Sequence, residues 1–254
     1  MFTIKSPLKY FPIKKGDYEL SYVKDSDEFI LREKNYSWMG YDQKSFWQSS
    51  EFYIELYRAQ GVCITTGLGL GILQSLLCLK KDVTKVIVYE KSNDVIEIFN
   101  EIVDYNNFDI SKMEIRNGNA DDISGQVCDC LFPDHFSAEP EDHVINIVKN
   151  LSLNNTTNLV WYWPAGLHFI KFAISKDLSL TNETYEQWKS YTQIKNLPVS
   201  LDEICLNYIS ELKNIYKKDV STSYGRDIEQ LELIKDQRKK LLEQSKKYKN
   251  QSQN

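Results

Sequence analysis

Three glycines at alternate positions between two apolar segments constrain the fold of this chain most strongly. They are Gly67, Gly69 and Gly71 in the stretch VCITTGLGLGIL. The segment before them, 62–66, predicts a buried strand, and the overlapping segment 70–79 predicts a helix. Glycine adopts positive φ and lets a ligand approach the backbone without a Cβ in the way. A glycine loop between strand and helix is typical of α/β domains that bind a nucleotide or nucleoside.

The spacing of these glycines separates the loop from two common phosphate-binding motifs. A dinucleotide fingerprint, GxGxxG, requires a third glycine where this chain has Ile72 or Gln74. A Walker A loop requires a Gly-Lys-Ser/Thr triplet, which does not follow here. The spacing therefore excludes a P-loop and disfavours an NAD-dependent oxidoreductase, which remains an alternative.

The segments from residue 62 to residue 163 alternate between strand and helix patterns. Strands are predicted at 62–66, 85–89, 113–116, 127–132 and 158–163, and helices at 70–79, 94–105 and 139–150. Such alternation implies parallel strands joined by right-handed crossovers. The sequence therefore predicts an α/β fold with a Rossmann-like, doubly wound and mostly parallel sheet.

The flanking segments have a different character. Residues 1–43 are β-rich, with a β-hairpin expected from 18–23 and 28–32, and a helix ended by Gly61 is expected over 46–60. After Pro164, helices are expected at 167–175, 183–191, 201–217 and 227–248, the third with Ser200 as N-cap and Glu203 completing a capping box. We therefore expect an N-terminal β-rich extension (1–45), a cofactor-binding core (46–175) and a helical C-terminal region with a basic, partly disordered tail (176–254).

The charge of the chain is unevenly distributed. The net charge is −5, but residues 235–254 hold seven Lys or Arg and two acids, a net +5, which leaves −10 for the rest. An acidic chain argues against a nucleic-acid-binding surface over the whole protein. The basic tail is typical of a solvated helix, and alternatively of a contact with nucleic acid or an acidic partner.

The cysteine pattern and the hydropathy of the chain indicate in which cellular compartment the protein is expected. The five cysteines include no CxxC pair, so no metal site is predicted, and an odd count with apolar neighbours favours reduced thiols. The longest apolar run, 68–79, is too short to span a bilayer. We expect a cytoplasmic protein without a membrane partner.

Glu90 follows the glycine loop at the expected place for a ribose ligand. It stands nineteen residues after Gly71, at the end of the second predicted strand. A carboxylate there can accept hydrogen bonds from both ribose hydroxyls of an adenosine. Strand, glycine loop, helix, strand and terminal acid together predict a cofactor that contains adenosine.

At these residues the chain resembles the class I S-adenosylmethionine-dependent methyltransferases, over roughly residues 55–165. The resemblance implies that the glycine loop lies against the methionine part of S-adenosyl-L-methionine, that Glu90 binds the ribose, and that the segment 117–121 lies at the adenine. The implied cofactor-binding residues are Thr66, Gly67, Gly69, Gly71, Glu90, Asn119 and Ala120.

The chain departs from the family at three places. Thr65 stands where the family usually has an acid before the first glycine, and Asn119 replaces the usual acid at the adenine. The two last strands of the family, a hairpin, are not evident after Trp163. The sheet is therefore either truncated or completed by strands hidden in 166–200.

The resemblance places the loop after the fourth strand at the transferred group. Asp134 and His135 are the candidate catalytic residues, because His135 could take a proton near neutral pH. A solvated or helix-capping role is the alternative for His135, and structural roles are expected for His143 and His168. The aromatic run 161–163 would either stack on a planar or cationic substrate or pack in the core.

The predicted function is methyl transfer to an unidentified acceptor, which could be a small molecule, a protein or RNA. A weaker resemblance to spermidine-synthase-like aminopropyltransferases rests on the fold, the N-terminal β segment and the spacing of Asp129 and Asp134; a further acid of that family would fall at Ser137. A third alternative is a non-catalytic module of methyltransferase fold, which Thr65 and Asn119 favour.

Overall fold

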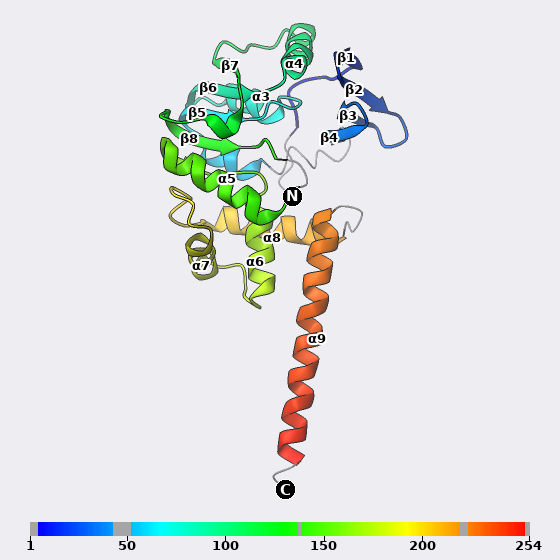
Figure 1. Cartoon of the computed structure of the whole chain (residues 1–254), viewed down its shortest axis with the longest axis vertical. Helices are drawn as coiled ribbons and strands as arrows, with labels where there is room; N and C mark the ends of the chain where they lie inside the picture. Colours follow the sequence, from blue (N-terminus) through cyan, green and yellow to red (C-terminus); the bar gives the residue numbers. More distant parts are fainter. Residues whose placement is uncertain (1–4, 43–51, 137–138, 219–222, 252–254) are drawn as a thin grey trace. The chain divides into compact units, whose positions relative to one another are not determined.

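The structure is a computed structural model that describes residues 5–42, 52–136, 139–218 and 223–251 (Figure 1). The chain divides into two compact units. The first contains Met1–Pro164 and Thr192–Val199, and the second contains Ala165–Tyr191 and Ser200–Asn254. The domain boundaries predicted at 45/46 and 175/176 remain predictions.

The first unit is built on a parallel sheet of five strands. The strands are β5 (Gly61–Thr66), β6 (Val83–Glu90), β7 (Met113–Asn117), β8 (Val127–Pro133) and β9 (Thr156–Val160). Their order is β7-β6-β5-β8-β9, and all four neighbouring pairs are parallel. The predicted α/β fold with a doubly wound parallel sheet is confirmed.

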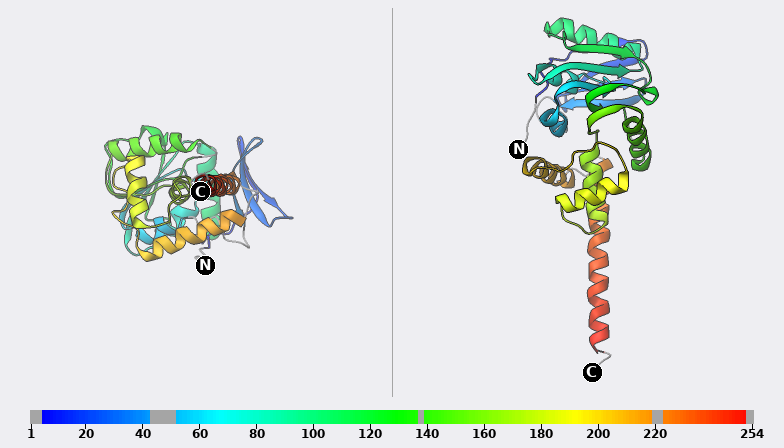
Figure 2. Two further views of the ribbon diagram at one scale, coloured as in Figure 1. Left: turned by 90° about the horizontal axis from the view of Figure 1, so that it is seen from below. Right: turned by 90° about the vertical axis from the view of Figure 1, so that its left-hand side faces the viewer.

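Helices cover both faces of this sheet (Figure 2). The chain runs from β5 through α3 (Ile72–Leu79) to β6 and through α4 (Asn93–Asn106) to β7, then from β8 through α5 (Glu141–Asn154) to β9. These two series move in opposite directions across the sheet, so right-handed crossovers place α3 and α4 on one face and α5 on the other. The chain reverses direction at β5, which lies between β6 and β8.

A second sheet, antiparallel and of four strands, precedes the core. Its strands are β1 (Ile13–Lys15), β2 (Tyr18–Val23), β3 (Glu28–Glu33) and β4 (Tyr36–Asp42), so the predicted hairpin is confirmed and extended on both sides. Polar contacts attach this sheet to α4: the Asp17 N–H donates to Asp94 Oδ2 (3.2 Å), and Lys15 pairs with Glu101.

The helix predicted over 46–60 is partly outside the described residues. The described part is α2 (Tyr53–Arg58), and residues 46–51 are not described. The expectation that Gly61 ends this helix was wrong. Ala59 is already extended, with ψ of 133°, and Gly61 begins β5, where its N–H donates to Asp82 O.

The last strand of the parallel sheet is shorter than predicted. Pairing in β9 ends at Val160 instead of residue 163. Trp161 and Trp163 still donate single N–H bonds to the β8 carbonyls of Leu131 and Pro133. Pro164 follows, and a proline cannot donate the next ladder bond.

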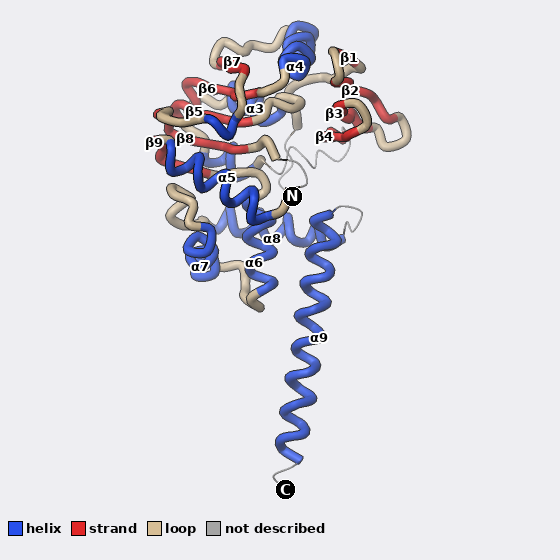
Figure 3. The backbone as a smooth tube through the Cα atoms, viewed as in Figure 1, coloured by secondary structure: helices blue, strands red, loops and turns tan. Residues whose placement is uncertain are grey.

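Helices are the only regular secondary structure among the described residues of the second unit, and loops join them (Figure 3). It contains α6 (Ala165–Ser175), α7 (Asn182–Thr192, whose last residue falls in the first unit), α8 (Glu203–Lys218) and α9 (Ser223–Gln251). The four predicted helices are confirmed, and the described residues after Val160 contain no strand. Among the described residues the parallel sheet therefore ends at five strands.

The capping box predicted at Ser200 was wrong. Helix α8 begins at Glu203, and Asp202 caps it: Asp202 Oδ1 accepts from the Cys205 N–H (2.9 Å), and its carbonyl accepts from the Leu206 N–H. An aspartate two residues closer to the helix satisfies the same orphan donors, so the serine is not needed.

The described residues give two further findings on cysteines and membranes. Each of the five cysteines is a buried thiol that forms no disulfide. Within the described ranges, the helices lack the combination of length and apolarity that a bilayer crossing requires.

Candidate functional site

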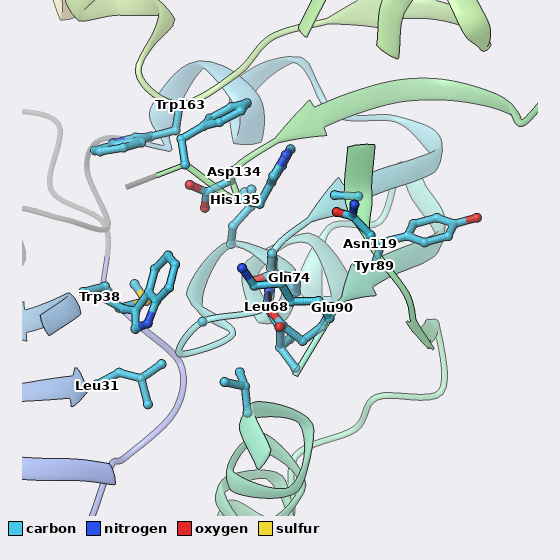
Figure 4. A pocket seen from close by; sticks show the side chains of 18 of the residues that line it. Leu31, Trp38, Leu68, Gln74, Tyr89, Glu90, Asn119, Asp134, His135 and Trp163 are labelled. Atoms are coloured by element: carbon cyan, nitrogen blue, oxygen red, sulfur yellow. Dashed lines mark hydrogen bonds between the residues drawn. The ribbon is translucent and has the colours of Figure 1, made fainter. Parts of the chain in front are cut away.

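A cavity of about 390 Å³ opens at the carboxyl ends of β5, β6 and β8 (Figure 4). This is the switch point of the sheet, where open α/β folds bind ligands. All residues that line it belong to the first unit. The predicted site residues Gly67, Gly69, Glu90, Asn119, Ala120, Asp134 and His135 are among them. Thr66 and Gly71 are buried beside the cavity and are not in its wall.

The glycine loop requires glycine at all three positions. The φ angles of Gly67, Gly69 and Gly71 are 75°, 51° and 70°, a region that disfavours side chains. A Cβ would meet the Asp134 carbonyl oxygen at 2.3 Å from Gly67, and Phe99 at 2.1 Å from Gly71. At Gly69 it would meet only the flexible Met39 thioether, at 2.5 Å. The loop is thus tightly packed at both ends and open at its middle glycine.

Glu90 holds the glycine loop in place. Its Oε2 accepts from the Leu68 N–H and its Oε1 accepts from the Ser92 N–H, both at 2.8 Å. The side chain is only 8% exposed but lines the cavity. Each carboxylate oxygen has a second lone pair, so the group can still accept hydrogen bonds from a ligand.

Gln74 is a site residue that sequence reasoning used only as evidence against a dinucleotide fold. Its buried amide donates to the carbonyl of Gly67 (2.7 Å) and to the hydroxyl of Thr65 (3.3 Å). The side chain thus ties the first turn of α3 back to the loop. Gln74 stands where a GxGxxG loop would have its last glycine. This position in the loop was the sequence signal that could have identified Gln74 as a site residue.

Asn119 and Ala120 form the cavity wall beyond β7. Asn119 caps a short 3-10 turn, η1 (Ala120–Asp122), and its Oδ1 accepts from the Asp121 N–H at 3.3 Å. Asn119 is exposed and Ala120 is buried. The amide oxygen of Asn119, which replaces the family's acid at the adenine, already accepts one hydrogen bond and keeps one further lone pair.

His135 lies at the centre of a hydrogen-bonded chain. Its Nε2 contacts Asp121 Oδ1 (3.0 Å) and its Nδ1 contacts Thr66 Oγ1 (2.5 Å). A carboxylate only accepts, so we assign the proton of the neutral ring to Nε2. Nδ1 then accepts from the Thr66 hydroxyl, whose oxygen in turn accepts from the Asp134 N–H (3.1 Å).

Burial favours the neutral form of this histidine. Desolvation lowers the pKa of His135 below its ordinary 6.5, although the Asp121 carboxylate raises it. Because both ring nitrogens have protein partners, the ring must break a bond before it can take a substrate proton. The geometry therefore favours His135 as a positioning residue over the predicted base, and that catalytic role stays a prediction.

Asp134 is fixed by its backbone and presents its side chain to the cavity. Its N–H donates to both the carbonyl and the hydroxyl of Thr66, each at 3.1 Å. Asp134 and His135 extend in different directions from their shared loop in Figure 4. Of the two predicted catalytic residues, Asp134 thus has the side chain better placed to meet a ligand.

The other acid of the aminopropyltransferase pattern does not join this cavity. Asp129 Oδ2 accepts from the Val62 N–H (2.8 Å), and its Oδ1 accepts from the Asn158 amide (3.2 Å). These contacts tie β8 to its two neighbours in the sheet. The structure therefore separates Asp129 and Asp134, which the sequence spacing had suggested as a pair.

The antiparallel sheet contributes a wall that the sequence did not predict. Tyr18, Leu31, Trp38 and Met39 line the cavity. Met39 Sδ accepts from the Leu70 N–H (3.2 Å). The Lys91 ammonium lies 5.2 Å from the centre of the Trp38 ring. No local pattern signals such contacts, because they join segments far apart in the chain.

The remaining predicted aromatic and histidine residues divide between cavity and core. Trp163 lines the cavity, whereas Trp161 and Tyr162 are buried at 2% and 0% exposure. His143, on α5, is exposed at the cavity edge. His168 is buried in α6, where desolvation lowers its pKa to about 3. In the part of the chain that the structure describes, no group of three His, Cys, Asp or Glu could hold a metal ion.

Comparisons with known proteins give matches among solved structures only. A scan against family models and a search among curated proteins both find no match. Spermidine synthase from Thermotoga maritima is similar at 14% identity and a TM-score of 0.44, over 60% of this chain and 55% of that one. Phosphoethanolamine N-methyltransferase 1 from Haemonchus contortus, solved with phosphoethanolamine and S-adenosylhomocysteine, matches at 14% identity and a TM-score of 0.34, over 45% of this chain and 25% of that one.

Mitomycin 7-O-methyltransferase matches at 15% identity and a TM-score of 0.35, over 47% of this chain and 38% of that one. The matched proteins belong to the two families that the sequence resembles, and the chain spans 55% or less of each of the three. At these TM-scores the likeness decides neither fold nor function, so both rest on the geometry of the chain itself.

Proposed function

We propose that this protein binds S-adenosyl-L-methionine and transfers its methyl group to an acceptor. The observation that carries the proposal is the glycine loop closed against Glu90 at the switch point of the sheet. Three glycines at alternate positions all have positive φ and lie beside an open cavity. They let a ligand approach the backbone closely, which no other residue type would allow.

The residues present fit an adenosine cofactor. Glu90 has lone pairs left for ribose hydroxyls, and the middle of the glycine loop meets only a flexible side chain. Asn119 and Ala120 would border the adenine on the next wall. Thr65 is fully buried and hydrogen-bonded to Gln74, so it would not replace the acid that the methyltransferases use there.

When bound, S-adenosyl-L-methionine would supply a methyl group that leaves a sulfonium sulfur for a lone pair of the acceptor. The protein would then mainly hold and align the acceptor. Asp134 would accept the proton that the acceptor releases, while Thr66 and His135 keep the Asp134 backbone at the end of β8.

Calorimetric titration with S-adenosylmethionine, S-adenosylhomocysteine, decarboxylated S-adenosylmethionine and NAD tests the cofactor. We expect micromolar binding of the first two. Gly69→Ala should abolish it, since the new methyl group enters the open middle of the loop. Gly125→Ala is the matched control, because Gly125 also has a positive φ (66°), has no atom within 4 Å of its Cβ and does not line the cavity. Binding of none of the four would refute the proposal.

Aminopropyl transfer is the second candidate. The acids of the cavity favour it, because decarboxylated S-adenosylmethionine lacks the carboxylate they would repel. The placement of Asp129 outside the cavity counts against it. Tighter binding of the decarboxylated donor in the same titration would favour this candidate, and cofactor binding without turnover of any acceptor would favour a non-catalytic module.

Two further proposals concern the cellular compartment of the protein and the binding partner of its basic tail. The five buried free thiols support a reducing compartment such as the cytoplasm. The net charge of +5 over residues 235–254 supports contact of this tail with nucleic acid or an acidic partner. Binding of a labelled RNA that persists after removal of the tail would refute the second.

A further inference from the structure

Gln74 lines the cavity from the first turn of α3, where two hydrogen bonds hold its side chain (Figure 4). Its Nε2 donates to the Gly67 carbonyl at 2.7 Å and to the Thr65 hydroxyl at 3.3 Å. Because a carbonyl oxygen only accepts, the amide nitrogen must be the atom that faces Gly67. The protein therefore fixes the direction of the amide oxygen as well.

The amide oxygen of Gln74 is an unused acceptor. It receives no hydrogen bond from the residues that the structure describes. The side chain is only 1% exposed, but this oxygen is not sealed inside the protein, unlike the partnerless hydroxyl oxygen of Ser75, the next residue of α3. The surface that Gln74 keeps in the cavity wall thus includes its oxygen. A nearly buried acceptor without a donor is unfavourable until a ligand supplies one.

The strand order places this oxygen beside one part of the proposed cofactor. The carboxyl ends of β7, β6 and β5 lie next to one another in this order. Asn119 follows β7, Glu90 ends β6, and Gly67 follows β5. An adenosine with its adenine at Asn119 and its ribose at Glu90 directs its 5′ substituent toward β5 and Gln74. In S-adenosyl-L-methionine this substituent is the methionine part.

The chemistry of the methionine part selects the group that meets Gln74. Its polar groups are a carboxylate, which only accepts hydrogen bonds, and an α-ammonium, which only donates them. An amide oxygen therefore attracts the ammonium and repels the carboxylate. The neighbouring Thr65 is fully buried and does not line the cavity, so the acceptor at this place comes from Gln74.

We infer that Gln74 is a specificity-determining residue of the cofactor site, and that its amide oxygen accepts a hydrogen bond from the α-ammonium of the cofactor. The inference rests on the proposed function and deepens it. The two amide protons hold the glycine loop, and the oxygen of the same amide selects cofactors that carry an α-amino group.

Three ligands that share an adenosine test this inference. They are S-adenosylhomocysteine, its analogue with hydrogen in place of the α-ammonium, and 5′-methylthioadenosine, each titrated calorimetrically into the full chain. We expect S-adenosylhomocysteine to bind at least about tenfold more tightly than the deaminated analogue, because a hydrogen bond to a charged group contributes that much. A ratio near one in the unmodified protein would overturn the inference.

Gln74→Met separates recognition of the ammonium from support of the loop. Methionine has a similar length, no N–H donor and only a weak acceptor, so all three ligands should weaken. If Gln74 binds the ammonium, the preference for S-adenosylhomocysteine over the deaminated analogue also falls to about one. A native preference in this variant would mean that Gln74 only supports the loop, and would overturn the inference. Gln60→Met is the matched control, because Gln60 is exposed and does not line the cavity.

Gln74→Glu is the conservative variant. A carboxylate keeps acceptor oxygens and loses both N–H donors to the loop. Binding of 5′-methylthioadenosine should therefore weaken, while the preference for S-adenosylhomocysteine over the deaminated analogue stays at least as large as in the unmodified protein. Loss of this preference in Gln74→Glu would contradict the assigned role of the oxygen.

Failure of the inference is distinguishable from failure of the proposed function. Equal binding of S-adenosylhomocysteine and the deaminated analogue would leave the adenosine site intact and refute the role of Gln74. Binding of none of the three ligands would refute the proposed function and, with it, the inference.

Discussion

Replacing Glu90 by glutamine tests whether this carboxylate holds the glycine loop. Both of its oxygens accept backbone N–H bonds at 2.8 Å, from Leu68 and Ser92, in a side chain that is 8% exposed. A glutamine of the same shape has only one acceptor oxygen. Its amide nitrogen must then face the other backbone N–H, donor against donor.

The magnitude follows from these two bonds. The backbone N–H left without an acceptor costs about 1–3 kcal/mol, and reducing the other bond from charge-assisted to neutral strength costs about 1 kcal/mol. The free energy of unfolding should therefore fall by about 2–4 kcal/mol. Affinity for S-adenosylhomocysteine should fall about 10- to 100-fold, because ligand hydroxyls lose a charged acceptor.

Chemical denaturation measures the stability change, and amide hydrogen exchange localises it. The Leu68 and Ser92 amides should exchange faster in the variant. Glu97→Gln is the matched control, because Glu97 is exposed on α4 and makes no such bond; it should stay within about 0.5 kcal/mol of the unmodified protein. If Glu90→Gln behaves like this control, Glu90 does not hold the loop and the reasoning fails.

Three other variants give sharp expectations. Gly71→Ala should lower the free energy of unfolding by about 2–5 kcal/mol, because φ is 70° and the new Cβ meets Phe99 at 2.1 Å, whereas Gly118→Ala should be neutral in thermal denaturation. His168 has a folded pKa of about 3 against 6.5, so its neutral form stabilises the fold above pH 6.5 and this contribution is lost as pH falls. By pH 5 the loss is about 2 kcal/mol relative to His168→Asn, and parallel pH profiles of the two proteins would contradict the assignment. The pKa of His135 is also lowered, so its contribution to the free energy of unfolding should likewise be lost as the pH falls below 6.5. In His135→Gln this part of the pH dependence of unfolding should be absent.

The sequence predicted the parts of the site that depend on local pattern. The strand before Gly67, the helix after Gly71 and the strand that ends at Glu90 each have a periodicity that survives in the fold. Because parallel strands align their carboxyl ends, residues that follow these strands meet at one edge of the sheet. The order of elements along the chain therefore sufficed to bring Glu90 to the loop.

The sequence pattern of a strand did not predict which polar group each acidic side chain would contact. Asp129 and Asp134 have a spacing that suggests a pair, but Asp129 turns to the Val62 N–H within the sheet. Its neighbours in β8, Cys128 and Cys130, are buried in the core. Which polar group a strand acid meets depends on the adjacent strand, and the sequence of one strand does not record its neighbour.

Contacts between distant segments were equally hidden. Met39 and Trp38 reach the cavity only because β4 belongs to a sheet attached to α4 through Asp94 and Glu101. The start of α8 at Glu203 was also not predictable from the sequence, although it depends on residues close together in the chain. Ser200 and Asp202 are both good N-cap residues, so the sequence alone does not choose between them, and the structure uses Asp202.

The polar groups predicted to meet a cofactor are largely engaged with the protein already. Glu90 accepts two backbone bonds, Asn119 caps its own turn, and both nitrogens of His135 have partners. Loss of activity in a variant of any of these residues thus has two origins, a displaced loop or a lost ligand contact. Thermodynamic linkage separates them, since a ligand stabilises the folded protein by RT ln(1 + [L]/Kd). A variant that only displaces the loop keeps its intrinsic Kd, so ligand in excess over Kd restores the native loop. A variant that removes a ligand contact has a raised Kd even where its free energy of unfolding is unchanged. By this criterion we expect Glu90→Gln to lower both the free energy of unfolding and the intrinsic affinity for the ligand. We expect His135→Gln to lower the free energy of unfolding and to keep the intrinsic affinity.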